Sequence, residues 1–282
     1  MHLSKDVDFL QRSSRSAERH ANLSLFQAFC TQVRVIFALI MRETLTRYGR
    51  ENIGFLWVVG EPILFCGGVA VVWTAVRPSH EHGLQMTAMV ITGYIPLTMF
   101  RHALSRSTKA YEVNSSLLFH KLVTPLDIIF ARTTLEVLGV LIAAIIITFG
   151  AIILGYMAPP VDWSFTYAGL FFVIFFSYGV SFIFAYLTER SDTLEKAVGV
   201  INYLSLPWTG AFVMIDWLPP QYRWILEDTS PLANAIELMR SGVFGSKVVA
   251  HYSLMYLFYT CGITFLIGLY LTLKIRPHIN MS

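Results

Sequence analysis

The chain has 282 residues, of which 55% are hydrophobic and 14% charged, and its mean hydropathy is +0.57. Soluble domains carry closer to a quarter charged residues, and a chain this apolar cannot hide its surface in one soluble core. The formal net charge is only +3, and the basic residues form no stripe on a soluble module, which argues against a nucleic-acid partner. The composition therefore predicts an all-α protein covered largely by lipid.

Residues 1–50 are predicted to be a cytoplasmic segment that ends in an amphipathic helix over residues 24–47. Apolar side chains recur there at three- to four-residue spacing, namely Leu25, Phe29, Val33, Phe37 and Ile40. Arg34, Arg42 and Arg47 supply a basic side that suits anionic lipid headgroups. The pattern favours an interfacial helix over a soluble helix packed on the bundle.

Residues 51–282 are predicted to form a polytopic transmembrane domain with six spans. A hydrocarbon core about 30 Å thick needs roughly 20 helical residues. The segments that meet this length are about 53–76, 86–104, 128–157, 164–187, 197–215 and 252–275. Most lysines and arginines lie in the N-terminal segment, in the second and fourth connections and at the C-terminus. By the positive-inside rule, both termini are expected in the cytoplasm.

The connection between the second and third spans, residues 105–125, is expected to be the longest cytoplasmic connection. Asn114 or Ser115 can cap a short helix, and Pro125 prevents this helix from running straight into the next span. The apolar side chains that this helix would expose are Leu117, Leu118 and Leu122. Either a partner protein covers them or the loop rests on headgroups, and the pattern does not decide between these.

The largest outer connection, residues 216–247, contains two short helical segments that are too short to span. Pro219 begins the first segment, Pro231 lies in the first turn of the second, and Gly242 and Gly245 end it. The two segments are either re-entrant helices in the outer leaflet or amphipathic helices on the surface. Backbone at membrane depth would have to be covered by protein or line water.

The sequence contains no nucleotide-binding loop and no catalytic or metal-binding constellation. The nearest approach to a phosphate-binding loop, residues 242–247, lacks the required spacing. The chain is therefore expected to bind no cofactor and to take its energy from a partner or an ion gradient.

Ionisable and aromatic side chains within or beside the spans are the candidates for a substrate path or gate. An isolated carboxylate at Glu61 is costly in a membrane, so it should face a partner or water. Arg132 and Glu136 are four residues apart and can pair, or Arg132 can reach the interface. Aromatic rings stack on the C–H faces of sugars but also serve in packing and interfacial belts. The aromatic candidates are Trp57, Tyr178, Tyr203, Trp208, Trp217 and Trp224.

Three stretches resemble one known family. Arg42–Arg50, Ile53–Trp57 and Glu61-Pro62 resemble the entry to the first span of ABC-2 type permeases, and are most similar to inner-membrane permeases of capsular polysaccharide exporters. Residues 113–132 resemble the coupling loop and third-span start of that family, and residues 218–240 its outer loop. The resemblance covers nearly the whole chain.

The resemblance implies a homodimeric permease of the bacterial inner membrane. Two copies of a separate cytoplasmic ATPase would bind ATP and Mg²⁺, and a lipid-linked acidic polysaccharide would be the cargo. A periplasmic co-polymerase and an outer-membrane channel would be further partners. The resemblance assigns contact with the ATPase to Asn114, Ser115, Leu117, Leu118 and Lys121.

Other functions remain open from the sequence. O-antigen and teichoic acid permeases share the expected architecture. An ion-coupled secondary transporter would need paired acidic residues at mid-membrane, for which Glu61 is a weak candidate. A lipid-modifying membrane enzyme would need clustered His, Asp or Glu at a membrane surface, and the sequence shows no such cluster.

Overall fold

The computed structural model describes residues 25–48, 54–76, 80–81, 83–118 and 123–279, which are mostly helical. The helices are α2 (Leu25–Tyr48), α3 (Gly54–Val76), α4 (Met86–Ser107), α5 (Ala110–Val113), α6 (Ser115–Leu118), α7 (Pro125–Ile153), α8 (Trp163–Arg190), α9 (Asp192–Trp208), α10 (Trp224–Glu227), α11 (Pro231–Phe244) and α12 (Leu254–Ile279). Short 3₁₀ turns cover Ile215–Trp217, Pro220–Tyr222 and Gly245–Lys247. Strands β1 (His80–Glu81) and β2 (Leu84–Gln85) form a small antiparallel hairpin.

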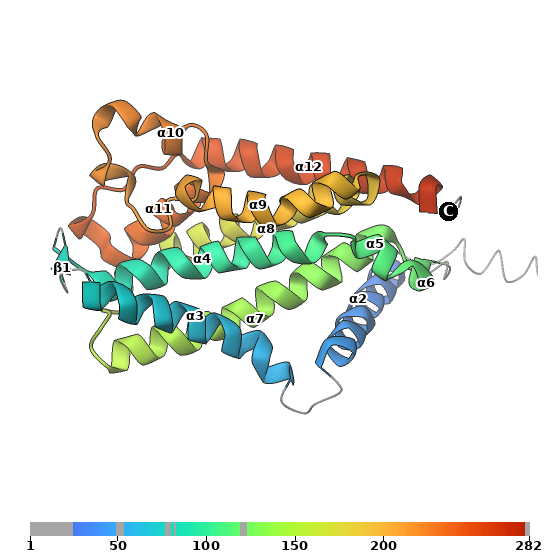
Figure 1. Ribbon diagram of the computed structural model, residues 1–282, viewed down its shortest axis with the longest axis horizontal. Helices are drawn as coiled ribbons and strands as arrows, with labels where there is room; N and C mark the ends of the chain where they lie inside the picture. Colours follow the sequence, from blue (N-terminus) through green and yellow to red (C-terminus); the bar gives the residue numbers. More distant parts are fainter. Residues whose placement is uncertain (1–24, 49–53, 77–79, 82, 119–122, 280–282) are drawn as a thin grey trace, which may run out of the picture.

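The long helices run roughly along the longest axis of the molecule (Figure 1). α8 lies in the middle of the packing and contacts α4, α11 and α12, while α7 contacts α2, α3 and α4. β1, α10 and α11 gather at one end, and α5, α6 and the C-terminal end of α12 lie at the other. α2 runs obliquely to the bundle at this second end, which is the orientation expected of an interfacial helix.

Among the described residues, three helices are long and apolar enough to cross a membrane: Pro125–Ile153, Trp163–Arg190 and the Leu254–Ile275 part of α12. The first spanning segment expected from the sequence forms α3, whose strongly apolar part is the shorter stretch Val59–Trp73. α4 and α9 occupy two further expected spans. The complete set of six spans stays a prediction.

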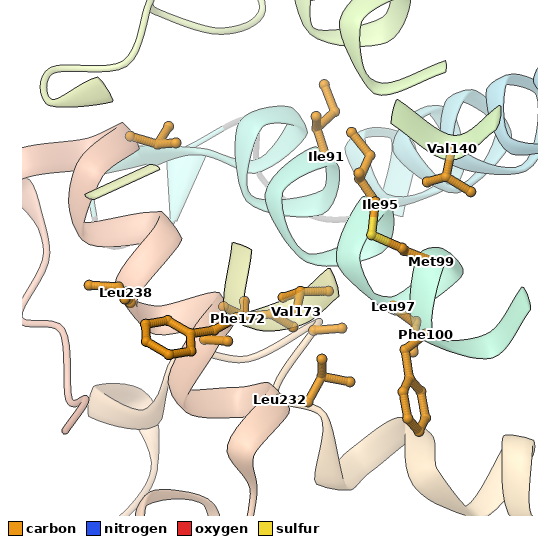
Figure 2. Close-up of a cluster of buried hydrophobic side chains, with 14 of the residues drawn as sticks. Ile91, Ile95, Leu97, Met99, Phe100, Val140, Phe172, Val173, Leu232 and Leu238 are labelled. Atoms are coloured by element: carbon orange, nitrogen blue, oxygen red, sulfur yellow. The ribbon is translucent and has the colours of Figure 1, made fainter. Parts of the chain in front are cut away.

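The main hydrophobic core lies where α4, α7, α8 and α11 meet (Figure 2). α4 contributes Leu97 and Met99, both fully buried, and α8 contributes Val173. Leu232 and Leu238 of α11 are fully buried in the same cluster. Other parts of the protein cover both the apolar and the polar face of α11, because every residue from Pro231 to Arg240 is buried. α11 is therefore not a surface helix, and its depth in the membrane stays a prediction.

Two helix starts follow from local capping. Thr124 accepts a hydrogen bond from the Asp127 N–H and the Asp127 side chain accepts one from the Thr124 N–H, so α7 begins at Pro125, slightly before the expected 128. Ser230 accepts from the Ala233 N–H and Pro231 occupies the first turn of α11. Proline and cap together specify both starts.

The expected fifth span, 197–215, is wrong at its C-terminal end, because α9 stops at Trp208. The next residues turn and present their carbonyl groups to the guanidinium of Arg240, which is fully buried. Arg240 Nη1 donates to the carbonyls of Gly210 at 2.9 Å and Val213 at 3.2 Å, and Nη2 donates to Ala211. The buried arginine satisfies the carbonyls that a continued helix would have bonded itself.

Candidate functional site

A pocket of about 420 Å³ lies between α3, α4 and α9. Its lining residues are Glu61, Pro62, Phe65, Tyr94, Thr98, Arg101, His102, Ser105, Arg106 and Tyr203. Most of them lie on α4 at three- and four-residue intervals, so they share one helix face. The Asn202 Nδ2 atom donates to Ser105 Oγ at 2.7 Å and fastens α9 beside this face.

The carboxylate of Glu61 has a partner in the pocket wall. His102 Nε2 lies 3.8 Å from Glu61 Oε1, and its Nδ1 lies 3.4 Å from Glu136 Oε2. Arg106 Nε lies 3.3 Å from the other oxygen of Glu136, a carboxylate that is buried on α7. Arg106 therefore compensates the buried Glu136 carboxylate, as a buried charge requires. Glu61 was expected to face a partner or water; it lines the pocket with His102 beside it, and its part in a substrate path stays a prediction.

Arg132 lies on the part of α7 that packs against α2. Its Nε is 3.3 Å from Glu43 Oε1 of α2, while Glu136 is held by α4 as described above. The sequence allowed a pair between Arg132 and Glu136, and that pair stays a prediction. Packing of α2 and α4 against α7 brings each of the two residues within reach of a side chain from another helix. Arg132 does not line the pocket.

Arg101 is a pocket residue that the sequence did not single out. Its guanidinium carbon lies 5.2 Å from the centre of the Tyr203 ring, which joins α4 to α9. The Tyr203 residue is 67% exposed, so most of its surface stays open. The helical spacing of Arg101 from Tyr94 and Thr98 could have placed it on the same helix face. Its contact with Tyr203, about a hundred residues away in the chain, could not be predicted from the sequence.

The other aromatic candidates lie outside this pocket. Tyr178 bonds Thr134 Oγ1 at 2.7 Å and stacks on Phe130, so it joins α8 to α7. Trp208 Nε1 donates to Thr229 Oγ1 at 3.0 Å. Three further tryptophans, exposed or packed beside the core, are Trp57, Trp217 and Trp224. Their roles in a substrate path stay predictions.

The proposed coupling segment forms two single-turn helices, α5 and α6, with Asn114 between them. Asn114 is buried, donates to the Ala110 carbonyl at 2.9 Å and accepts from Arg42 Nη1 at 3.1 Å. Leu117 and Leu118 are half-buried rather than exposed, since Leu118 packs against the cluster around Tyr111. Ser115 is exposed, and Lys121 lies outside the described residues.

The α2 helix contacts this segment and α7 with a face that combines polar side chains and the buried Leu39. Gln32 donates a hydrogen bond to Asp127, and Glu43 pairs with Arg132. Phe29 and Phe37 are 66% and 62% exposed on α2, which leaves an apolar stripe for lipid. The Arg47 side chain lies outside the described residues. The headgroup contacts of Arg42 and Arg47 stay predictions.

Lys109 fastens the coupling segment to the α8–α9 turn. Its Nζ lies 3.2 Å from Glu112, 2.9 Å from Asp192 and 4.0 Å from Glu195, and its N–H donates to Thr188 Oγ1. The hydrogen bond to Asp192, and then the one to Glu112, raise the pKa of Lys109, and the same contact lowers the pKa of Asp192. Both groups are therefore charged at neutral pH.

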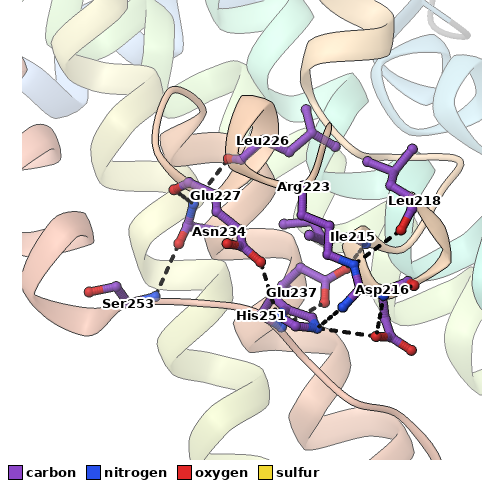
Figure 3. Close-up of polar contacts among 10 residues, drawn as sticks. All are labelled: Ile215, Asp216, Leu218, Arg223, Leu226, Glu227, Asn234, Glu237, His251 and Ser253. Atoms are coloured by element: carbon purple, nitrogen blue, oxygen red, sulfur yellow. Dashed lines mark hydrogen bonds and ion pairs between the residues drawn. The ribbon is translucent and has the colours of Figure 1, made fainter. Parts of the chain in front are cut away.

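The opposite end of the molecule has its own polar cluster (Figure 3). His251, which precedes α12, lies 3.2 Å from Asp216 and 2.9 Å from Glu227, and Arg223 lies 3.1 Å from Asp216. The buried Glu237 accepts hydrogen bonds from the N–H groups of Ile215 and His251. These contacts hold the 215–227 connection against α11 and the start of α12.

The model of the ABC-2 type transporter family matches residues 34–244, a stretch that includes the pocket, the coupling segment and α11. The chain belongs to the ABC-2 type transporter family. Among curated relatives of this ABC-2 transporter, the capsule polysaccharide export inner-membrane protein CtrC of Neisseria meningitidis serogroup B is 34% identical over 254 residues, which cover 89% of this chain and 94% of CtrC. BexB of Haemophilus influenzae, with the same description, is 36% identical over 231 residues, covering 82% and 87%. The polysialic acid transport protein KpsM of Escherichia coli is 27% identical over 252 residues, covering 86% and 93%.

Proposed function

We propose that this chain is the membrane permease subunit of an ATP-driven exporter that moves capsular polysaccharide across a bacterial inner membrane. The observation that carries this proposal is the similarity along nearly the full length of relatives whose names state capsule polysaccharide export and inner-membrane location. The family match over the region that holds the pocket supports the same conclusion.

The chain acts in this proposal as a homodimer with six spans per copy and both termini in the cytoplasm. Open apolar surface supports the dimer: α3 exposes Leu64 and Phe65, and α9 exposes Val200 and Leu204 beside the pocket. A second copy that packs there would close the pocket and line a path with the same faces twice. Two cytoplasmic ATPase subunits would contact the α5–α6 segment, and ATP and Mg²⁺ would bind to those subunits.

The contacts described for α2 and α7 suggest how movement at the coupling segment reaches the pocket. Asn114 is bonded to Arg42, and the neighbouring Glu43 is paired with Arg132 of α7. One turn further along α7, Glu136 is paired with His102 and Arg106 in the pocket wall. Movement of α5 and α6 would thus shift α7 relative to α4.

The test combines export with co-purification. In an encapsulated bacterium that carries this gene, deletion should remove capsular polysaccharide from the cell surface and leave polymer in the cytoplasm, and the intact gene should restore export. The purified complex should contain a P-loop ATPase, and replacement of the ATPase's own phosphate-binding lysine should block export equally. Export by the chain alone with a proton gradient would instead establish an ion-coupled transporter. Retention of O-antigen or teichoic acid, rather than capsule, would change the cargo.

A further inference from the structure

We propose that Arg101 and Tyr203 form an anion-binding subsite of the pocket, which takes a carboxylate or phosphate group carried by a sugar or a lipid. This inference rests on the proposed export function, because it names the part of the cargo that the pocket recognises. It adds a residue, Arg101, to which no candidate role was assigned from the sequence.

The charges of the pocket wall single out Arg101. Arg106 is paired with Glu136, and Glu61 is paired with His102. Arg101 has no carboxylate within ion-pair distance among the described residues, and its Nε atom is buried there without a hydrogen-bond acceptor. An N–H group that has lost water and gained no acceptor is unfavourable, and the half-buried guanidinium that carries it borders the pocket, so an oxygen-bearing ligand there would be stabilised by Arg101.

The shape of the Arg101–Tyr203 pair suits an acidic sugar. Guanidinium groups bind carboxylate and phosphate oxygens through parallel hydrogen bonds, and they do so better than a lysine ammonium. The Tyr203 ring stays largely open and lines the same pocket, so a sugar ring can pack on its free surface while its charged group reaches Arg101. The pocket volume of about 420 Å³ accommodates a sugar unit of this kind.

The net charge of the lining favours an anion over a neutral sugar. The wall carries two guanidinium groups, Arg101 and Arg106, against one carboxylate, Glu61. The Glu136 carboxylate behind the wall is the ion-pair partner of Arg106 but does not line the pocket. The positive charge that no carboxylate compensates is therefore that of Arg101, which lies beside Tyr203 in the pocket wall.

The test measures binding by the full-length protein in phosphatidylcholine nanodiscs. The probes are fluorescent tetragalacturonic acid, which carries carboxylates, short-chain phosphatidylglycerol, which carries a phosphate, and neutral maltotetraose. Arg101→Gln should weaken binding of the anionic probe at least tenfold, Arg101→Lys should restore part of it, and maltotetraose should bind no better to the wild type than to R101Q. The anionic probe that responds identifies a sugar carboxylate or a lipid phosphate as the source of the charge.

Matched variants separate recognition from folding. Arg190, which also lies over a tyrosine ring, Tyr186, is outside the pocket, so Arg190→Gln should leave binding unchanged. Tyr203→Leu, at an exposed position, should weaken the galacturonate probe severalfold and leave the phosphate probe unchanged. Monodisperse elution of each variant shows that it is folded. Equal binding of the anionic probes by the wild type and R101Q would overturn the proposal, as would equal weakening by Arg190→Gln.

The outcome distinguishes this inference from the proposed function. Suppose that cells with the wild-type gene and cells with Arg101→Gln export capsule equally, and that the purified variant binds the probes as the wild type does. The subsite proposal is then wrong, and the exporter proposal stands. If the probes depend on Arg101 but deletion of the gene leaves capsule export intact, the subsite stands and the exporter is wrong.

Discussion

Arg42 of α2 donates a hydrogen bond from Nη1 to Oδ1 of Asn114, although the two residues are 72 positions apart in the chain. Asn114 is buried and is bonded in turn to the Ala110 carbonyl. The bond ties the oblique helix α2 to the segment expected to contact the ATPase, at the end of the molecule expected in the cytoplasm. A residue that the sequence offered as the cap of a short helix is thus part of the packing between α2 and α5.

Loss of this bond should uncouple ATP hydrolysis from export. We expect Arg42→Met and Asn114→Ala each to lower surface polysaccharide severalfold while the complex still hydrolyses ATP, because α5 and α6 would move without α2. The double variant should be no worse than the more affected single variant, since both remove one interaction. Arg34→Met, on an exposed part of the same helix, is the control and should export normally. Additive losses in the double variant would show that the two residues act separately.

Replacement of Arg240 should prevent stable folding. Arg240→Met leaves the carbonyls of Gly210 and Val213 without a donor and the neighbouring Glu237 without its cation, at a cost of about 3–5 kcal/mol. Arg240→Lys should rescue little, because one ammonium cannot reach all the acceptors. The measurement is the melting temperature and monodisperse fraction in detergent, with the exposed Lys247→Met as control. A stable Arg240→Met protein would contradict the role of this residue in ending α9.

An alanine at Gly242 should disrupt the packing of α11 on α8. A Cβ atom there would lie 2.4 Å from the Thr166 backbone nitrogen and 2.6 Å from the Asp162 carbonyl oxygen, so the helices would have to separate. We expect Gly242→Ala to lower the free energy of unfolding by more than about 2 kcal/mol. Gly262→Ala on α12 has open space around its Cβ and should be neutral or slightly stabilising. Thermal unfolding of both variants provides the comparison, and equal melting temperatures would count against this close approach.

The Lys109 contacts should keep the coupling segment beside the α8–α9 turn over a wide pH range. Lys109 has a left-handed backbone with φ of 49°, which asparagine tolerates, so Lys109→Asn removes the ion pairs without adding much strain. Spin labels at Val113 and Thr193 should give a narrow distance distribution in the wild type and a broad one in this variant. The exposed Lys196→Asn is the control and should stay narrow.

The pH dependence follows from the direction of each shift. The lowered pKa of Asp192 means that its stabilisation is present above the ordinary value of about 3.9 and is lost as the pH falls through the folded value. The raised pKa of Lys109 means that its stabilisation is present below about 10.4 and is lost only at still higher pH. The label distance should therefore be constant from about pH 5 to pH 9. A broader distance distribution within that pH range would show that another titrating group holds the coupling segment beside the α8–α9 turn.

The orientation can be tested with membrane-impermeant maleimide. After replacement of the exposed Cys30 by serine, a cysteine at Ser116 should react only when the inner membrane is permeabilised. A cysteine at the exposed Gln221, which shortly precedes α10 at the opposite end of the molecule, should react in cells whose outer membrane alone is permeable. Cys66 and Cys261 are buried and should contribute little background. Labelling of Ser116 from the periplasm would reverse the predicted topology.

The sequence alone determined the helical class, three spans that meet the length and composition test, and the start of α11. These features depend on local properties: a run of apolar residues long enough for a membrane, a cap three residues before its partner, and a proline in the first turn. The family resemblance followed in the same way from the order of short motifs, and the family model confirmed it.

Only the tertiary structure decided which charged and aromatic groups meet. Arg132 lies 3.3 Å from Glu43 of another helix, Arg101 lies over Tyr203, and Arg240, which the sequence places in the outer connection, is fully buried. Packing selects each of these partners, because it brings side chains that are distant in the sequence within reach and excludes water. That choice depends on which helices are neighbours, and no local pattern in this chain records it.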